Sequence, residues 1–135
     1  MEEKGIALET AMVAALEGVE GLSGRVCPVV DIQKSTGPLV VYDPRRESEE
    51  RSIDGREGLL FAETIVHVLH NGYKKMRLLC ENVKAALEAL EGLAEGSLLI
   101  EAVEVELATP DIHEQKVELF RRTYNVKFYY QIKED

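Results

Sequence analysis

The sequence predicts an α+β domain: a mostly antiparallel β-sheet with two helices packed on it, plus a charged extended arm or hairpin. Two segments repeat apolar residues at helical spacing, and three longer segments alternate apolar and polar residues as strands do. With 135 residues the chain has the length of one typical domain. We therefore expect a single domain over residues 1–135, with 43–58 as a mobile charged arm.

The first element is a helix from Ile6 to about Val19, which Gly18 and Gly21 end. Its apolar positions recur at helical spacing and are Ile6, Met12, Val13, Leu16 and Val19. The segment Arg25–Ile32 is short and β-branched and contains a proline, which cannot donate to a ladder. It is predicted to be an edge or irregular strand, and Leu39–Tyr42 is predicted to be the second strand.

The segment Asp43–Gly58 has a different character and reads DPRRESEERSIDGREG. Ile53 is its only large apolar residue, so the segment cannot cover a core. The pair Asp54-Gly55 is a hairpin-turn signal. We expect a long, charged, mobile arm or hairpin; the alternative is a solvated loop without a role.

The middle of the chain predicts a strand followed by a helix. Over Leu59–Leu69 one face carries Leu60, Ala62, Thr64, Val66 and Val68, and the other carries Phe61, Glu63, Ile65 and His67. Asn71 is a candidate N-cap for a helix over Tyr73–Leu90. The apolar stripe of that helix consists of Met76, Leu79, Cys80, Val83, Leu87 and Leu90.

The last third of the chain predicts a hairpin. Over Leu98–Leu107 the residues Val103, Val105 and Leu107 point one way, and Glu104 and Glu106 point the other way. A turn at Thr109–Asp111 begins a link that continues to about Gln115. The final strand, Lys116–Ile132, has Phe120, Tyr124, Val126, Phe128, Tyr130 and Ile132 on its buried side. We expect Glu104 to lie near Arg121 across this hairpin.

The composition is that of a soluble globule, with 45% hydrophobic and 30% charged residues. The net charge of −9 makes the chain a poor candidate for a nucleic-acid clamp or for binding to an anionic membrane. Cys27 and Cys80 form no disulfide framework, and both are expected to be reduced. The N-terminus lacks a signal-peptide pattern, so we expect a cytoplasmic protein unless the chain leaves in a particle.

The search for catalytic motifs finds no phosphate-binding loop, no dinucleotide fingerprint and no nucleophile elbow. His67 and His70 fall on opposite faces of a strand, and Cys80 lies in an apolar stripe where a thiol is inert. The sequence does not force the acids Asp31, Asp43, Asp54 and Glu63 together into a metal site, and the tyrosines Tyr124, Tyr129 and Tyr130 are expected to pack. We predict no cofactor, no metal and no enzymatic activity.

The layout nevertheless resembles a known family. The resemblance rests on six segments, which are Leu8–Leu16, Gly24–Pro28, Pro38–Tyr42, the Ile53–Gly55 turn, the helix that begins at Tyr73 and the strand that ends in Phe128–Tyr130. Together they resemble the tail terminator proteins of long-tailed bacteriophages and prophages, also known as tail completion or tail-to-head joining proteins. The resemblance covers nearly the whole chain.

The resemblance implies a structural protein that caps the tail tube, ends tail polymerisation and forms the surface that joins the head. It implies a ring, typically a hexamer, with the tail tube and the head connector as partners and with DNA passing through the lumen unbound. It also implies assembly in the bacterial cytoplasm and final residence in the virion tail. The alternative is a cytosolic α+β adaptor, or a small-molecule-binding protein or enzyme.

In a ring, one surface of a subunit meets a different surface of the next subunit. The residues expected at this contact are arginines of the arm, Arg45, Arg46, Arg51 and Arg56, and the acidic residues Glu104 and Glu106 of a neighbour. Arginine suits such a contact because its planar fork can bind a carboxylate through two hydrogen bonds.

Overall fold

The computed structural model describes residues 2–28, 37–53, 56–114 and 118–132, with side chains over 6–28, 37–45, 59–113 and 118–132. The elements in chain order are α1 (Glu2–Glu17), β1 (Val26–Pro28), β2 (Leu39–Ile53), β3 (Arg56–His70), α2 (Tyr73–Glu88), β4 (Ala94–Glu95), β5 (Leu98–Glu114) and β6 (Leu119–Ile132). The expected α+β class is confirmed.

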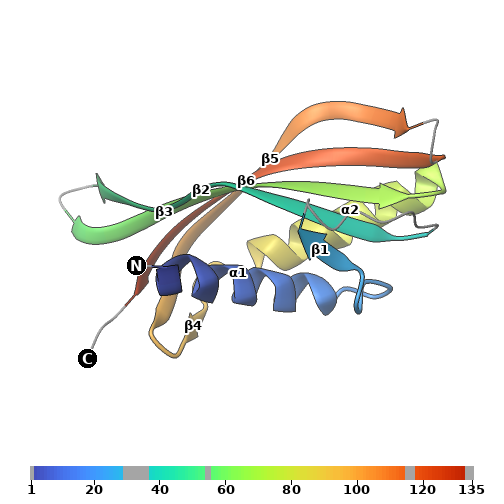
Figure 1. Ribbon diagram of the computed structural model, residues 1–135. Helices are drawn as coiled ribbons and strands as arrows, with labels where there is room; N and C mark the ends of the chain where they lie inside the picture. The colour runs from blue at the N-terminus through green and yellow to red at the C-terminus, as the bar shows by residue number, and fades with distance from the viewer. Residues whose placement is uncertain (1, 29–36, 54–55, 115–117, 133–135) are drawn as a thin grey trace.

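The strands form one sheet in the order β1-β2-β3-β6-β5-β4. The β1·β2 pair is parallel and all other pairs are antiparallel. Both helices lie on one face of this curled sheet, and no described residues form a helix on the other face (Figure 1). We call these the helix face and the helix-free face.

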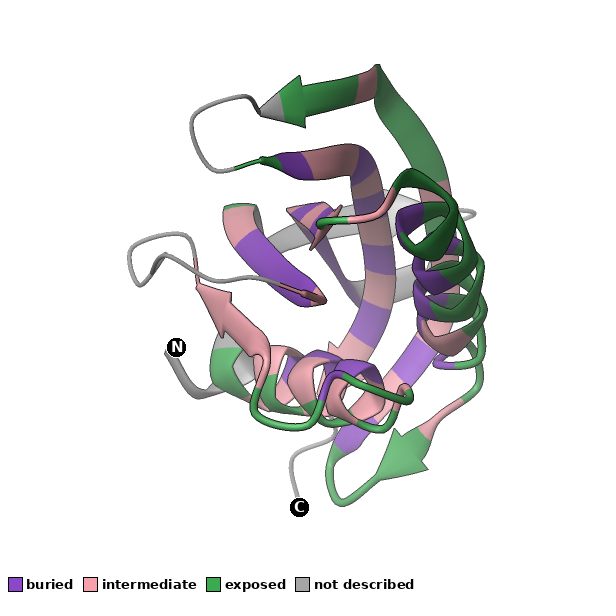
Figure 2. Ribbon diagram, turned by 90° about the vertical axis from the view of Figure 1, so that its right-hand side faces the viewer, coloured by how far each residue is buried: buried purple, intermediate pink, exposed green. Residues whose placement is uncertain are grey.

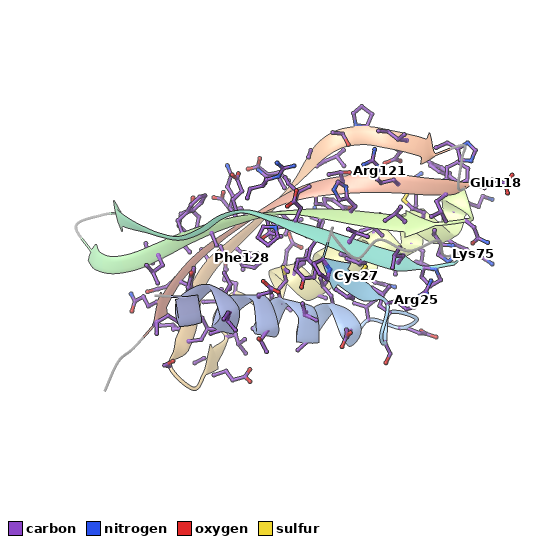
Figure 3. All side chains as sticks on the ribbon, in the orientation of Figure 1. Arg25, Cys27, Lys75, Glu118, Arg121 and Phe128 are labelled. Atoms are coloured by element: carbon purple, nitrogen blue, oxygen red, sulfur yellow. The ribbon has the colours of Figure 1, made fainter. Side chains whose placement is uncertain are left out.

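The core fills the space between the helices and the sheet (Figure 2). In β3 the alternating residues predicted for one face are all buried, and most of them pair with buried residues of β6, such as Ala62 with Phe128. Phe128 has no exposed surface and lies between the sheet and α1 (Figure 3). The apolar stripe predicted for α2 is also buried as expected.

Two details of the helices differ from the predictions. Ile6 is 61% exposed, because α1 buries Leu8, Met12 and Leu16 instead. A residue two positions from Leu8 lies about 200° around the helix and therefore points away from the core. The N-cap of α2 is Gly72 and not Asn71, whose Oδ1 lies 2.7 Å from the His70 Nδ1.

The charged segment 43–58 forms the far end of the β2–β3 hairpin, so the hairpin alternative is confirmed for its described part. Pairing continues from Leu39↔Leu69 to Ile53↔Arg56, with register shifts at Pro44/Arg46 and beyond. The hairpin extends past the helices (Figure 1). The expected Asp54-Gly55 turn lies outside the described residues.

The short strand β1 is an edge strand, as predicted. It spans only Val26–Pro28 within the predicted segment Arg25–Ile32, whose residues from 29 onward lie outside the described part. Arg25 Nε donates to the Pro38 carbonyl at 2.9 Å, which joins the chain before β1 to the chain before β2 (Figure 3).

The hairpin of the last two strands is confirmed, but its register differs from the prediction. Strand β5 continues through Thr109–Asp111, where a turn was expected, and two register shifts around these residues accommodate Pro110. Consequently Glu104 lies opposite Lys127 and Arg121 lies opposite Ile112. The expected proximity of Glu104 and Arg121 is wrong.

Candidate functional site

The structure holds the candidate nucleophile Cys80 and the candidate ligand His67 in contacts with other side chains. Cys80 is buried, its thiol lies 3.3 Å from the Met76 sulfur, and burial raises the pKa of the thiol to about 11. The Nδ1 of His67 lies 2.9 Å from the Thr123 hydroxyl on the helix-free face. The structure confirms the expected core thiol.

Within the described part of the chain, no group of three or more histidine, cysteine or acidic side chains could hold a metal ion. Of the four acids considered above, Asp31 and Asp54 lie outside that part. Asp43 forms an ion pair with Arg45, and Glu63 accepts a hydrogen bond from Asn125 at 2.8 Å. The predicted tyrosine packing is also seen, since Tyr124 and Tyr130 are buried and Tyr129 contacts Phe61.

A polar cluster among the described side chains links β5, β6 and α2. Arg122 donates from Nε and Nη2 to the two carboxylate oxygens of Asp111, at 2.7 and 2.8 Å. The Tyr73 hydroxyl donates to the same carboxylate at 3.2 Å. The hydrogen bond from Arg122 holds the pKa of Asp111 below its usual value. This cluster anchors the first turn of α2 to the β5–β6 hairpin.

A groove among the described side chains is open to solvent and has a volume of about 320 Å³. It lies between the chain after α1 and the exposed flank of α2, and its lining residues are Glu20, Gly21, Pro38, His70, Lys75, Leu78, Leu79 and Asn82. Small-molecule sites bury most of their ligand. An open groove of this kind does not enclose a ligand and gives no specific support to the small-molecule alternative.

The arginines of the predicted interface all lie on the β2–β3 hairpin. Arg45 is exposed and its guanidinium lies 3.0 Å from the Asp43 carboxylate. Arg46 lies opposite Glu63, Arg51 opposite Leu59, and Arg56 opposite Ile53 in the backbone register. The side chains of the last three arginines lie outside the described part.

The acidic half of the predicted interface, Glu104 and Glu106, is exposed on β5. Their backbone partners on β6 are Lys127 and Asn125, and these four positions share the helix-free face. Strands β3 and β6 separate β2 from β5 in the sheet. The structure therefore does not bring the arginines and the two acids together within one chain.

Strands β2 and β5 share a feature that the sequence reasoning missed, which is an open backbone edge. Strand β1 covers β2 only over Val40–Tyr42, and β4 covers β5 only over Leu98–Leu99. Over the rest of their lengths, β2 and β5 have no outer partner strand among the described residues. The signal was present in Pro44 and Pro110, because proline inside a strand is typical of sheet edges.

No protein-family model matches the sequence, and no curated protein matches it significantly. Solved structures do match. A chain from a structure described as the virion of a native gene transfer agent particle has a TM-score of 0.66 and 15% sequence identity, over 92% of this chain and 94% of its own. A second solved chain has 12% identity and a TM-score of 0.46, over 94% of this chain and 96% of its own.

The likeness to the gene transfer agent chain extends over almost the full length of both chains, so the two share a fold. None of the helices in the described part is long and apolar enough to cross a membrane.

Proposed function

We propose that this chain is a structural virion protein that caps a phage-type tail tube, ends its polymerisation and forms the head-tail joining surface. The observation that supports this proposal most is the fold shared with a chain of a gene transfer agent virion. The match covers 92% of this chain. The resemblance of the sequence to tail terminators supports the same role.

The proposed assembly is a ring of identical subunits, most simply a hexamer. A ring requires two unlike surfaces on each subunit, because a head-to-tail contact closes only if surface and counter-surface differ. Two such surfaces lie toward opposite edges of the same sheet. One is the hairpin that carries Arg45, and the other is the exposed acidic stretch of β5. The exposed Arg45 on the first surface and the carboxylates of Glu104 and Glu106 on the second can form ion pairs between neighbours.

The proposed partners are the tail tube protein on one side of the ring and the head connector protein on the other. DNA passes through the lumen without specific binding, which agrees with a net charge of −9. We propose assembly in the host cytoplasm and no catalytic activity. The inert Cys80 thiol and the structural Asp111–Arg122 cluster agree with a non-enzymatic role.

The test is the mass of the purified full chain, measured by size-exclusion chromatography with light scattering over a range of concentrations. We expect closed rings of about six chains, either alone or after purified tail tubes are added, and annular particles in negative-stain micrographs. A chain that stays monomeric at every concentration and does not bind tube ends would contradict the proposal.

A further inference from the structure

Strand β5 offers an unpaired backbone edge of defined extent. The Val103 N–H points away from β6, because it donates to the Glu91 Oε1 at 3.1 Å. Backbone groups alternate in direction along a strand, so Val105 and Leu107 also direct their N–H groups outward. Pro110 has no N–H group and ends this run. The free edge therefore covers Glu104–Thr109.

Strand β2 offers a second free edge on the opposite side of the sheet. The Val40 N–H donates outward to the Arg25 carbonyl at 3.0 Å, which is where β1 covers this strand. By alternation the nitrogen of Pro44 also faces outward, where its lack of a hydrogen is harmless. Beyond this proline, the edge over Arg45–Ile53 has no partner strand among the described residues. It is long enough to accept the shorter edge of β5.

The acidic charge on the β5 edge disfavours its pairing with a second β5 edge. Two β5 edges placed side by side would bring Glu104 and Glu106 of one copy next to the same acids of another, and adjacent like charges destabilise a sheet. The β2 edge begins instead with the exposed Arg45, and the stretch Arg45–Ile53 carries three arginines and three glutamates, so it has no net charge. Arg45 can therefore lie beside one of the two carboxylates, and the β2 edge adds no net negative charge to the contact.

The strand directions agree with such a contact. Strands β2 and β6 both run antiparallel to β3, and β5 runs antiparallel to β6. Within one chain β2 and β5 therefore point in opposite directions. If the sheet continues into a neighbour by rotation about an axis along the strands, β5 of one copy meets β2 of the next in antiparallel orientation.

From these edges, charges and directions we propose that the β5 edge Glu104–Thr109 binds the β2 edge Arg45–Ile53 of a second copy of this chain. The contact forms a continuous antiparallel sheet between neighbours. The inference rests on the proposed function for the ring itself and specifies which surfaces build it. Because the two edges differ, each copy can bind one neighbour on each side, as a ring requires.

Crosslinking tests the contact directly. In a Cys27→Ser background, Arg45→Cys and Glu106→Cys are combined in one chain, and a short bis-maleimide is added to the assembled protein. Cys80 can stay, because it is buried and the pKa of its thiol is raised to about 11. We expect a ladder of covalently joined chains in a denaturing gel.

The matched controls are the two single variants. Each alone should give monomers only, and a mixture of the two should give dimers and nothing longer, because each chain then carries one reactive site. A double variant that sediments as a ring but gives no ladder would overturn the edge contact and leave the proposed function standing. A single variant that crosslinks to itself as well as the mixture does would also overturn it, by showing a symmetric contact.

A second pair of variants tests the backbone. Leu107 is 59% exposed, and Leu107→Pro removes an outward N–H group without touching the ladder to β6. We expect Leu107→Pro to raise the concentration needed for ring formation at least tenfold, and Leu107→Ala to leave it within about twofold. Equal assembly of both variants, with unchanged circular dichroism, would refute the backbone pairing; if Leu107→Pro does not fold, the crosslinks decide.

Discussion

Replacing Asp111 with asparagine tests whether the Asp111–Arg122 pair holds the β5–β6 hairpin in its observed register. The two side chains are only 20% and 19% exposed, and they share two short hydrogen bonds. A hydrogen bond to a charged partner contributes about 1.5–3 kcal/mol. Asparagine keeps one acceptor and loses the charge, so we expect the free energy of unfolding to fall by about 2 kcal/mol.

The effect should depend on pH in a defined direction. Arg122 holds the pKa of Asp111 below its ordinary value of 3.8. A carboxylate with a lowered pKa in the folded state contributes its full stability above the pKa of the unfolded chain, and loses it as the pH falls through the folded pKa. The difference between the wild type and Asp111→Asn should therefore be constant from pH 7 to about 5 and shrink below about pH 4.

Urea denaturation followed by circular dichroism at pH 7, 5 and 3.5 measures both quantities. The matched control is Glu104→Gln, which makes the same chemical change at an exposed position of the same strand and should lower the free energy of unfolding by less than about 0.5 kcal/mol. Equal stability of the two variants at pH 7 would refute the reasoning. A loss for Asp111→Asn that does not change with pH would refute it as well.

Four further results are expected. Reversing Arg45 and Arg46 to glutamate should block ring formation in sedimentation experiments and leave circular dichroism unchanged, because the arm contributes little to the core. Amides of residues 43–58 should exchange faster than those of the sheet centre in the free chain and slow in the ring, as mass spectrometry can measure. The Cys80 thiol, whose pKa burial raises to about 11, should resist iodoacetamide at pH 8 until urea unfolds the chain. Gly92→Ala should lower the free energy of unfolding in urea by about 1–2 kcal/mol, because Gly92 has a φ of +88°.

Each of these four predictions has a control or a contradicting outcome within the same protein. Lys74→Glu with Lys75→Glu makes the same charge change on the exposed start of α2 and should not affect assembly; equal loss would show that net charge alone matters. Full protection of the arm amides in the free chain would contradict the second expectation. Cys27 is only partly buried and should be labelled before Cys80. Gly18→Ala should be nearly neutral, because Gly18 is not in the left-handed region.

The sequence could predict those parts of the fold in which the pattern of apolar residues within one segment decides its secondary structure and its buried face. The alternation over β3 and the apolar stripe of α2 indicated the side chains that face the core, because the period of each element decides which residues share a face. Leu107 shows the limit of this reasoning. It continues the apolar face of Val103 and Val105, yet it is 59% exposed, since periodicity assigns a face without saying whether another element covers it.

The parts that could not be predicted depend on contacts between distant segments. The register of β5 against β6 is set by a long ladder and by the ion pair between the Asp111 and Arg122 side chains, and Pro110 is tolerated on an open edge. A turn signal at Thr109–Asp111 could not reveal this. Pro44 indicates that β2 has an open edge, but the extent of that edge depends on the length of β1, which β2 does not encode.

The most direct measurement of the proposed role is the length distribution of tails, read from negative-stain micrographs of particles made with and without this chain. Without it, we expect tails of variable and excessive length and heads that carry no tail, and expression of the chain from a plasmid should restore both. Tails of uniform length joined to heads in the absence of the chain would contradict the proposed function.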